Sequence, residues 1–381
     1  MALVTETYPP EVNGVALTLS RWVEGLRAMD HRLQLVRPRQ GREDQARQED
    51  AFSEILAPGI PLPRYPGLRL GLPFARALIR RWKKEKPHLV HVATEGPLGL
   101  SALWAAKRLG IPATTSFHTR FDHYSRHYLF GLEALARGYL RFVHRLSAIT
   151  LAPTSRLAQT LAQGGFGKTA VVGRGVDKTL FNPQRRDLDL RRSWGAADDD
   201  LVLLYVGRVA KEKNMALLWR AWGKLQGQAP KARLVVVGEG PLLEESKRLY
   251  GKSVLFTGKK LGENLARHYA SADVFLFPSM TDTFGNVVLE AMASGLAVCA
   301  FADGAAQEHV VHGVHGLLAP LGDEEAFLEQ ALGLARSPAQ TGRMGEAAAR
   351  APGLKDWGAV TKELEAILIE VIGEDQGGIG A

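Results

Sequence analysis

The chain has 381 residues, 46% of them hydrophobic and 23% charged, which is typical of a soluble globular protein with room for two domains. Normal apolar content excludes a disordered chain, and 40 glycines without a period exclude a collagen-like one. The single cysteine, Cys299, excludes a disulfide framework and lies in the apolar run LAVCAF, which indicates a buried, unreactive thiol. No apolar run reaches the roughly 18–20 residues of a membrane span, and Met1 opens no signal sequence, so the expected location is a reducing cytoplasm.

Positive charge is concentrated in the first half of the chain. The net charge is +8, but residues 1–180 carry 26 Lys and Arg against 14 Asp and Glu, and the remainder carries 22 against 26. This asymmetry indicates that one half faces an anionic partner. Nucleic acid, a phospholipid surface and a nucleotide-linked substrate all qualify.

Short apolar runs alternate with helix-period segments along nearly the whole chain. In the first half, strands are predicted at Ala2–Thr5, Arg32–Val36, Leu89–Thr94, Ala113–Phe117, Ala148–Ala152 and Ala170–Val172. In the second half, they are predicted at Leu201–Val206, Arg233–Val237, Val254–Phe256, Val274–Phe277, Ala297–Phe301 and Gly316–Leu318. This alternation predicts an α/β protein made of two doubly wound, Rossmann-like domains with parallel sheets.

The domain boundaries follow from where this pattern stops. Polarity rises near Phe181–Ser193, which predicts an N-terminal domain over 1–180, a linker over 181–197 and a C-terminal domain over 198–352. A helix over 353–372 carries one apolar stripe and is expected to pack back toward the N-terminal domain, followed by a flexible tail over 373–381. The first strand has only three apolar residues before Thr5, short for a central strand, which suggests that a few residues precede Met1.

Ligands of such sheets bind beyond the carboxyl ends of the strands, and two facing domains would place a substrate in the cleft between them. The loop after the first strand contains Gly14 just before a helix, where backbone N–H groups can approach an anion. A purely structural turn explains this glycine equally well. No dinucleotide fingerprint of the GxGxxG type follows any predicted strand.

Two loops of the second half contain pairs of charged residues. Arg208 and Lys213 lie five residues apart at a strand-to-helix corner and can clamp a diphosphate, although on their own they also fit a solvated charge run. Asp282 and Glu290 lie across a strand end and the helix after it, so one carboxylate can lie in the cleft and the other about two turns down the helix. Alternatively, Thr281 or Asp282 is simply the N-cap of that helix.

Together these motifs resemble the GT-B-fold retaining glycosyltransferases of family 4, which include bacterial α-mannosyl- and α-glucosyltransferases. The matching stretches are TETYPPEVNGVA, FHTRFDHY, GRGVDKTLFNP, YVGRVAKEKN, VVGEGP, FTGKK and FPSMTDTFGNVVLEAMASGLAV. They occur in the family's order and cover nearly the whole chain. The resemblance implies two Rossmann-like domains facing across a cleft and transfer of a mannose- or glucose-type hexose from a nucleotide-diphosphate sugar, either GDP-mannose or a UDP-sugar. It implies no cofactor beyond this co-substrate and no metal.

The resemblance also implies a role for each matching residue. Arg208 and Lys213 would bind the donor diphosphate and stabilise the leaving nucleotide, and Glu290 would hold the donor ribose. Asp282 stands where the family usually has Glu and would contact the hydroxyls of the donor sugar, with His118 contacting the transferring sugar from the first domain. The other donor-binding positions are Gly14, Glu239, Lys259, Phe284, Gly285, Asn286 and Val287. Retaining members deliver the acceptor hydroxyl from the face that the nucleotide leaves, with the departing phosphate as base, so no protein nucleophile is implied.

Three patterns look like metal sites but lack essential parts of one. Asp187 and Asp189 form a D-x-D within an arginine-rich stretch, with no apolar strand leading into it. The histidine groups have neither the Glu of HExxH nor a further ligand set by the sequence. They are His309, His312 and His315, and the pair His123 and His127. We therefore expect no metal site.

Two basic segments of the first half contain interleaved apolar residues. From Arg64 to Lys86 there are eight cations against Glu85 alone. The cations expected at a membrane or acceptor surface are Arg76, Arg80, Arg81, Lys83 and Lys84, with Arg137, Arg141 and Arg145 in the second segment. Such segments suit an anionic bilayer surface, although a solvated face is an alternative. Similar segments occur in family members that glycosylate lipids, so we expect a lipid or lipid-linked glycan acceptor and a peripheral location on the inner face of the cytoplasmic membrane.

Other functions remain open at this point. The same chemistry could act on a soluble acceptor or polysaccharide, and a sugar-nucleotide epimerase shares the fold, although the two charged pairs argue against it. A pI near 9.5 permits a nucleic-acid-binding module, but the sequence shows no recognition helix, zinc finger or RNP pattern, so no nucleic-acid partner is expected. A non-catalytic relative is disfavoured by the intact Arg208, Lys213 and Glu290. The sequence does not predict an oligomeric state.

Overall fold

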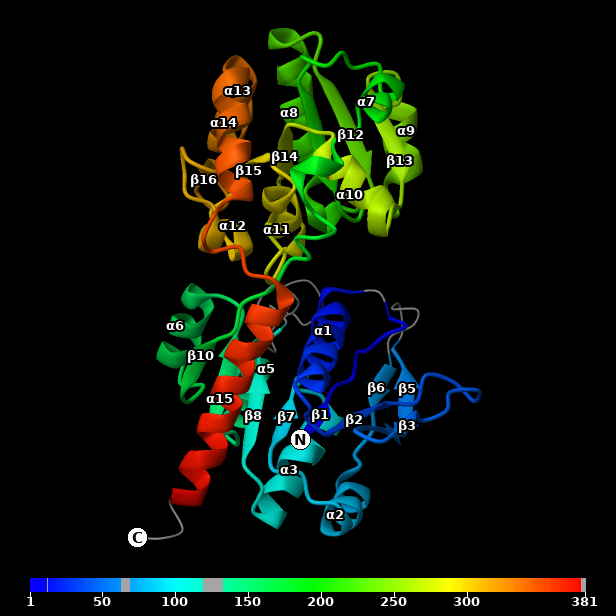
Figure 1. Ribbon diagram of the computed structural model, residues 1–381, viewed down its shortest axis with the longest axis vertical. Coiled ribbons are helices and arrows are strands. Elements are labelled where there is room, and N and C mark those ends of the chain that lie inside the picture. The colour runs from blue at the N-terminus through cyan, green and yellow to red at the C-terminus, as the bar shows by residue number, and fades with distance from the viewer. Residues whose placement is uncertain (12, 63–68, 119–132, 378–381) are drawn as a thin grey trace. The chain divides into compact units, whose positions relative to one another are not determined.

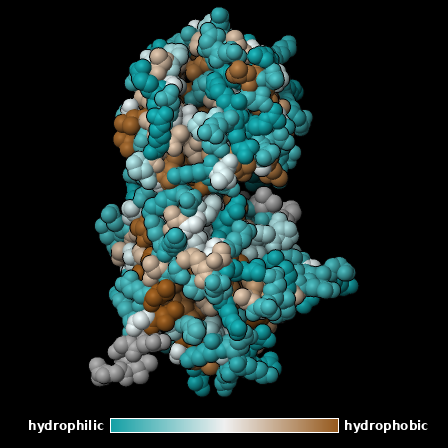
Figure 2. Space-filling model, viewed as in Figure 1, coloured by the Kyte–Doolittle hydropathy of each residue, from teal (hydrophilic) through white to brown (hydrophobic). Residues whose placement is uncertain are grey.

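The structure of the chain is a computed structural model that describes residues 1–11, 13–62, 69–118 and 133–377. Its internal contacts divide the chain into two compact units (Figure 1). Unit 1 comprises Met1–Arg174 and Trp357–Ala381, and unit 2 comprises Gly175–Asp356. On the face shown in Figure 2, hydrophilic residues cover most of both units and hydrophobic ones form separate patches.

Unit 1 is built around an eight-stranded sheet with the order β10-β9-β8-β7-β1-β2-β4-β3. All neighbouring strands run parallel except β3, which is antiparallel to β4. The strands are β1 (Ala2–Val4), β2 (Leu33–Pro38), β3 (Gln48–Glu49), β4 (Phe52–Ala57), β7 (Val90–Val92), β8 (Ala113–Ser116), β9 (Ile149–Ala152) and β10 (Thr169–Val171). A separate antiparallel pair consists of β5 (Gly59–Pro61) and β6 (Arg69–Gly71). The helices are α1 (Gly14–Ala28), α2 (Ala75–Lys84), α3 (Pro97–Leu109), α5 (Glu133–His144), α6 (Ser155–Gln163) and α15 (Trp357–Gly377).

Unit 2 contains a six-stranded, fully parallel sheet with the order β13-β12-β11-β14-β15-β16. Its strands are β11 (Val202–Val206), β12 (Arg233–Val237), β13 (Val254–Gly258), β14 (Val274–Phe277), β15 (Ala297–Phe301) and β16 (Gly316–Ala319). Its α-helices are α7 (Leu188–Ser193), α8 (Met215–Gln228), α9 (Leu243–Tyr250), α10 (Gly262–Ala270), α11 (Asn286–Ala293), α12 (Gly304–His309), α13 (Glu324–Arg336) and α14 (Pro338–Ala349). Two short 3-10 helices are η1 (Pro183–Arg185) and η2 (Lys211–Lys213).

Continuous apolar strands arise here because both faces of each sheet are covered. Successive side chains of a strand point to opposite faces, so each central strand contributes to two separate clusters of buried residues. In β11, Leu204 packs in one cluster and Leu203 in the other, and both are fully buried. In β1, Leu3 packs with Trp22 of α1, whereas Val4 packs with Trp82 of α2.

All twelve predicted strands are confirmed to within three residues at each end. The strands that the sequence did not predict are β3, β4, β5 and β6, which lie among polar and proline-rich residues. Strand β4 forms because it is held in the sheet: it pairs along its whole length with β2, and its Phe52 is only 2% exposed. Cys299 lies fully buried in β15, as predicted.

The predicted domain boundaries differ from the observed division. The first unit ends at Arg174 rather than at 180, and the predicted linker over 181–197 belongs to unit 2, where it forms η1 and α7. The charged residues of this segment predicted an exposed linker, but Arg191 is fully buried and pairs with Asp273 at 3.1 Å. The arginine thereby ties α7 to unit 2.

The last helix, α15, belongs to unit 1, where it packs against α1. Thr361 approaches Gly25 so closely that a Cβ on the glycine would lie 2.4 Å from the Thr361 hydroxyl oxygen. The helix continues to Gly377, beyond residue 373 where the sequence predicts a tail. Among the described helices none has both the length and the apolarity to cross a membrane.

Candidate active site

Three glycine-containing loops meet at the carboxyl ends of adjacent strands in unit 2. The Gly207 amide donates to Val237 O at 3.0 Å, and the Gly238 amide donates to Gly258 O at the same distance. Gly238 has a φ of +144°, and a Cβ there would lie 1.9 Å from Gly207 O. Gly238 must therefore be glycine, because the backbone of Gly207 lies against it, and backbone hydrogen bonds join the loops after β11, β12 and β13 along one edge.

The loop after β11 contains both cations that were assigned to the diphosphate. Arg208 is exposed, and its guanidinium lies 3.1 Å from Glu212 on the same loop. Lys213, at the end of η2, extends across to the loop after β14, where its ammonium nitrogen lies 2.7 Å from Asp282 Oδ1. The structure therefore brings Lys213 and Asp282 together, 69 residues apart in sequence.

Asp282 lies in a loop that packs closely against the η2 segment. The Ser279 hydroxyl donates to Asp282 Oδ2, and the Thr281 hydroxyl donates to Glu212 O at 2.9 Å. The N-cap of α11 is Gly285, with a φ of +90°, so the alternative that Thr281 or Asp282 caps this helix is wrong. The carboxylate of Asp282 is thus available to hold Lys213 and a ligand.

The start of α11 places the expected backbone amides at the carboxyl end of β14. Asn286 and Val287 are the first two helical residues and are partly exposed, so their N–H groups have no partner within the helix. Phe284 is 6% exposed, and its carbonyl accepts a hydrogen bond from Ala305 at 2.7 Å, which fixes the backbone before the turn. Partial positive charge at this end of the helix favours an anion.

Glu290 lies one turn into α11 and has a buried phenol as its partner. Tyr269 of α10, fully buried, donates its hydroxyl to Glu290 Oε2 at 2.9 Å. Burial raises the pKa of Glu290 to about 7, and the tyrosine hydrogen bond offsets part of this shift. The sequence did not identify Tyr269, because nothing in its local pattern distinguishes it from a core aromatic residue.

The two remaining donor positions of unit 2 are exposed. Glu239 follows β12 and Lys259 follows β13, so both lie at the same strand-end edge as Gly207. Within the described part of the chain, neither side chain makes a polar contact that would give it a separate role.

In unit 1, His118 follows β8 and is held in a buried chain of hydrogen bonds. The Arg174 guanidinium donates to His118 Nδ1 at 2.7 Å, and because a guanidinium only donates, the ring proton must lie on Nε2. That N–H donates to Ser116 Oγ at 2.7 Å, and the serine hydroxyl can then donate to Nε2 of His91 at 3.1 Å. Both ring nitrogens of His118 therefore have partners within unit 1.

Burial keeps both histidines of this chain neutral. It lowers the pKa of His91 to about 3 and that of His118 well below its ordinary value, with the charge of Arg174 adding to the effect on His118. His118 is thus a neutral hydrogen-bonding group at physiological pH rather than a proton carrier. Arg174 lies in the motif GRGVDK, yet the sequence alone did not suggest this partnership.

The loop after β1 contributes a carboxylate that the sequence did not identify. Glu6 Oε1 accepts from the Leu98 amide at 3.3 Å, at the start of α3, and a Cβ on Gly96 would lie 2.1 Å from the same oxygen. Burial raises the pKa of Glu6 to about 7, although this amide hydrogen bond favours the ionised form. Gly14, in the same loop, begins α1 after the N-cap Asn13, and a Cβ there would meet nothing within 4 Å. The space beside Gly14 is therefore open.

The basic segments of unit 1 form exposed helical surfaces. On α2, the buried residues are Leu78 and Trp82, and the exposed cations are Arg76, Arg80, Arg81, Lys83 and Lys84. On α5, Arg137 is exposed and Arg141 is half-buried, and Arg145, the residue after the helix, is also exposed. The same helix exposes Leu135 by 70% and Phe142 by 56%, so cations flank apolar side chains there. Arg64 lies outside the described residues.

The D-x-D pattern of Asp187 and Asp189 has a structural explanation. Asp187 is the N-cap of α7 and pairs with Arg267, while Asp189 pairs with Arg192 at 2.6 Å. Among residues 1–11, 13–62, 69–118 and 133–377 no cluster of three or more His, Cys, Asp or Glu side chains could hold a metal. His123 and His127 lie outside those ranges, as does most of the FHTRFDHY motif.

Comparison with known proteins identifies the family. The model described as Glycosyltransferase Family 4 matches residues 12–180, and that described as Glycosyl transferases group 1 matches residues 200–337. A GDP-mannose-dependent alpha-mannosyltransferase of Mycobacterium tuberculosis (strain CDC 1551 / Oshkosh) is 33% identical over 341 residues, which cover 87% of this chain and 86% of that one. An alpha-monoglucosyldiacylglycerol synthase of Streptococcus pneumoniae (strain ATCC BAA-255 / R6) is 27% identical over 79% of this chain and 70% of that one.

Solved structures give the same fold. Sucrose-phosphate synthase from Thermosynechococcus elongatus, 21% identical, matches with a TM-score of 0.79 over 98% of this chain and 99% of that one. The two parallel-sheet units and this match are those of the GT-B fold. The chain therefore belongs to the family 4 glycosyltransferases, adopts the GT-B fold and is a hexosyltransferase.

Proposed function

We propose that this enzyme transfers mannose from GDP-mannose to a membrane lipid or lipid-linked glycan, with retention of configuration and without a metal ion. The observation that carries the proposal is the Lys213–Asp282 contact of 2.7 Å, because it joins a phosphate-binding cation to a carboxylate that can hold sugar hydroxyls. The donor assignment follows the GDP-mannose-dependent relative, which covers most of this chain. The acceptor class follows the diacylglycerol-modifying relative and the basic surfaces of unit 1.

The proposed chemistry depends on charge that develops as the sugar leaves. Breaking the sugar–phosphate bond builds negative charge on the diphosphate and positive charge on the anomeric carbon. Arg208 and Lys213 would stabilise the first, and preorganised cations of this kind can lower a barrier by several kcal/mol. Because these two side chains supply the positive charge at the leaving group, the mechanism assigns no step to a metal.

Other groups of the donor would be held by the loops around β14 and α11. Glu290 would accept hydrogen bonds from the ribose hydroxyls, and Asp282 would contact the sugar hydroxyls while it orients Lys213. The acceptor hydroxyl would attack from the face that the nucleotide leaves, and its proton would pass to the departing phosphate. This sequence of steps requires no protein nucleophile.

The acceptor would be approached at a membrane surface. The five exposed cations of α2 and the exposed apolar residues of α5 suit an anionic bilayer, to which each cation contributes about 1 kcal/mol. A peripheral enzyme on the inner face of the cytoplasmic membrane fits these surfaces. Transfer to a lipid is preferred over a soluble acceptor or epimerisation, because the relatives' names describe mannosyl transfer and glycolipid synthesis.

A thermal-shift panel tests the donor assignment. The panel contains GDP-mannose, UDP-glucose, UDP-galactose and UDP-N-acetylglucosamine, with GDP and UDP as nucleotide controls and EDTA in parallel samples. We expect a rise in melting temperature with GDP and GDP-mannose that EDTA does not change. A shift confined to uridine nucleotides would overturn the GDP-mannose assignment, and loss of the shift with EDTA would overturn the metal-free clamp. Mass spectrometry of lipid extracts incubated with the donor then identifies the acceptor class.

A further inference from the structure

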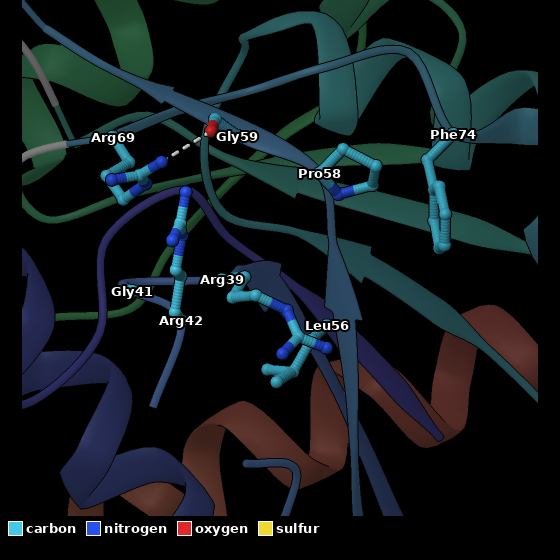
Figure 3. A pocket seen from close by; sticks show the side chains of 8 residues that line it. All are labelled: Arg39, Gly41, Arg42, Leu56, Pro58, Gly59, Arg69 and Phe74. Atoms are coloured by element: carbon cyan, nitrogen blue, oxygen red, sulfur yellow. Dashed lines mark hydrogen bonds between the residues drawn. The ribbon is translucent and has the colours of Figure 1, made fainter. Parts of the chain in front are cut away.

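A pocket of unit 1 lies outside the site described above. It has a volume of about 560 Å³, within the range of small-molecule sites, and lies where β2 and β4 end and α2 begins (Figure 3). Three arginines line it, Arg39, Arg42 and Arg69, together with the apolar residues Leu56, Pro58 and Phe74. Figure 3 shows Arg42 extending toward Arg69, with Pro58 and Phe74 across the pocket from Arg42.

The three guanidinium groups have more N–H donors than the hydrogen bonds they make. Arg39 donates to the Asp44 carbonyl at 3.1 Å, and Arg69 donates to the carbonyls of Gln40 and Gly59 at 3.3 and 2.6 Å. Within the described part of the chain, none of the three has a carboxylate oxygen within 4 Å. The Nε atom of Arg69 is buried and has no acceptor among those residues. A buried donor without a partner is costly, and a bound anion would supply the missing acceptor.

A separate ion-pair network holds the loop that presents Arg39 and Arg42. Arg37, almost fully buried at the end of β2, donates to both carboxylate oxygens of Asp44 at 2.7 and 2.9 Å. Asp44 also accepts from the Gln40 amide at 2.7 Å, and Arg37 pairs with the buried Glu54 at 3.0 Å. Both carboxylate oxygens of Asp44 are therefore engaged by Arg37, and neither forms an ion pair with Arg39, Arg42 or Arg69.

The pocket lies at the same edge of the sheet as His118, where an acceptor would receive the sugar. Arg39 follows β2 and Pro58 follows β4, so the pocket lies at the carboxyl ends of strands, the same edge at which His118 follows β8. In the sheet order, β8 is three strands from β2 and four from β4, which corresponds to roughly 14–19 Å at the usual strand spacing. An anion in the pocket would thus be separated from the transferring sugar by the length of a headgroup or of two to three sugar rings.

We propose that this pocket binds a phosphate ester of the acceptor, remote from the hydroxyl that receives the sugar. Arginines bind phosphate oxygens through paired N–H groups, and the apolar wall accepts the organic part of the ester. The proposal deepens the lipid or lipid-linked acceptor of the preceding section and rests on it. The phosphate could belong to a membrane lipid headgroup or to a water-soluble sugar phosphate, and the experiment separates these sources.

The test uses Arg39→Gln/Arg42→Gln as the main variant, because both side chains are largely free of structural contacts. The matched control is Arg32→Gln, an exposed arginine at the opposite end of β2. Isothermal titration with glycerol 3-phosphate, in the absence of a nucleotide, measures the pocket directly. We expect wild type and Arg32→Gln to bind alike and the double variant to bind at least about tenfold more weakly. No binding by wild type, or equal binding by the double variant, would overturn the proposal.

Vesicles distinguish the two sources of phosphate. If a lipid headgroup is the ligand, the double variant will also bind phosphatidylglycerol vesicles more weakly than Arg32→Gln, relative to phosphatidylcholine. If the ligand is soluble, the two variants will bind vesicles equally while glycerol 3-phosphate affinity still differs, and both results support the pocket. The GDP-induced thermal shift shows that the variants are folded and tests the donor site in unit 2, so its loss in wild type would overturn the proposed function without affecting the phosphate result.

Discussion

Arg174 donates a hydrogen bond to His118 Nδ1 over 2.7 Å, and this contact fixes the tautomer of a histidine at the carboxyl end of β8. The guanidinium also lies 5.7 Å from the centre of the Trp22 ring. Two buried side chains that lie 56 residues apart in sequence are thus joined by a hydrogen bond. Arg174 adds to the effect of burial in keeping the imidazole neutral, and it directs the ring proton toward Ser116.

Replacing Arg174 tests that relationship. In Arg174→Met, the pKa of His118 should rise, because the positive charge and the Nδ1 donor are both removed. His118 would then protonate at a higher pH, so kcat should fall more steeply on acidification than in wild type. The measurement is kcat between pH 5.5 and 8, with Arg108→Met, an exposed arginine of α3, as control. A pH profile parallel to that of wild type would contradict the proposed role, and an unchanged GDP-induced thermal shift verifies that unit 2 is intact.

Removal of either diphosphate cation should reduce turnover without unfolding the protein. Arg208→Ala and Lys213→Ala are each expected to lower kcat by about 10²- to 10³-fold, because each removes charge stabilisation from the leaving group. The matched control is Lys211→Ala, an exposed lysine on the same 3-10 helix. If both site variants have near-wild-type rates at saturating donor, Arg208 and Lys213 do not bind the diphosphate.

Asp282→Ala should affect sugar transfer more than nucleotide binding. The carboxylate pairs with Lys213, and in the proposed donor site it would contact the sugar hydroxyls while other residues hold the nucleotide. We expect a loss of about tenfold or more in kcat and a small change in the Kd for GDP. Asp282→Asn keeps the size of the side chain and separates shape from charge. Equal losses in transfer and in GDP affinity would contradict the sugar-facing assignment.

Glu290 should make nucleotide binding and thermal stability depend on pH. Its pKa is raised to about 7 in the folded protein from 4.5, so its contribution to stability is present below pH 4.5 and is lost as pH rises through about 7. The loss amounts to at most about 3 kcal/mol. Glu6, with a pKa raised to about 7 by burial, contributes in the same direction. The fall in melting temperature between pH 5 and 8 should therefore be smaller in Glu290→Gln, but not absent.

Glu290 should also make GDP affinity depend on pH, in the direction opposite to thermal stability. In the proposed donor site an ionised Glu290 would accept hydrogen bonds from both ribose hydroxyls, so GDP affinity should rise from pH 6 to pH 8 in wild type and stay flat in Glu290→Gln. Isothermal titration at three pH values checks this. A pH-independent affinity in wild type would show that the carboxyl does not hold the ribose.

Charge reversal on α2 should weaken membrane binding. Arg76→Glu, Arg80→Glu and Lys84→Glu in one protein changes three exposed cations spaced by one helical turn. At about 1 kcal/mol per cation, sedimentation with phosphatidylglycerol vesicles should fall by more than tenfold. The control reverses three exposed cations of unit 2, Lys231, Arg248 and Lys252. If both triple variants sediment like wild type, the cations of α2 are only a solvated surface.

The sequence alone was enough to predict all six strands of the sheet in unit 2 and six of the eight strands of the main sheet in unit 1, and to nominate residues for the donor site. Runs such as Leu201–Val206 and Val274–Phe277 are apolar and β-branched or aromatic throughout, and such runs are stable only as strands buried on both faces. Ligands of these sheets bind at the loops after the strands, which is why the sequence singled out Arg208 and Asp282, and Glu290 on the helix that follows.

Only the tertiary structure decided which of these residues meet. Lys213 reaches Asp282 and Arg174 reaches His118 because the order of the strands brings distant loops together at the edge of each sheet. Tyr269 reaches Glu290 because α10 packs against α11. Local sequence patterns contain no information on that order. The same reason applies to Arg191, whose charge is typical of an exposed linker although it lies buried beside Asp273, and to the three arginines that line the phosphate pocket.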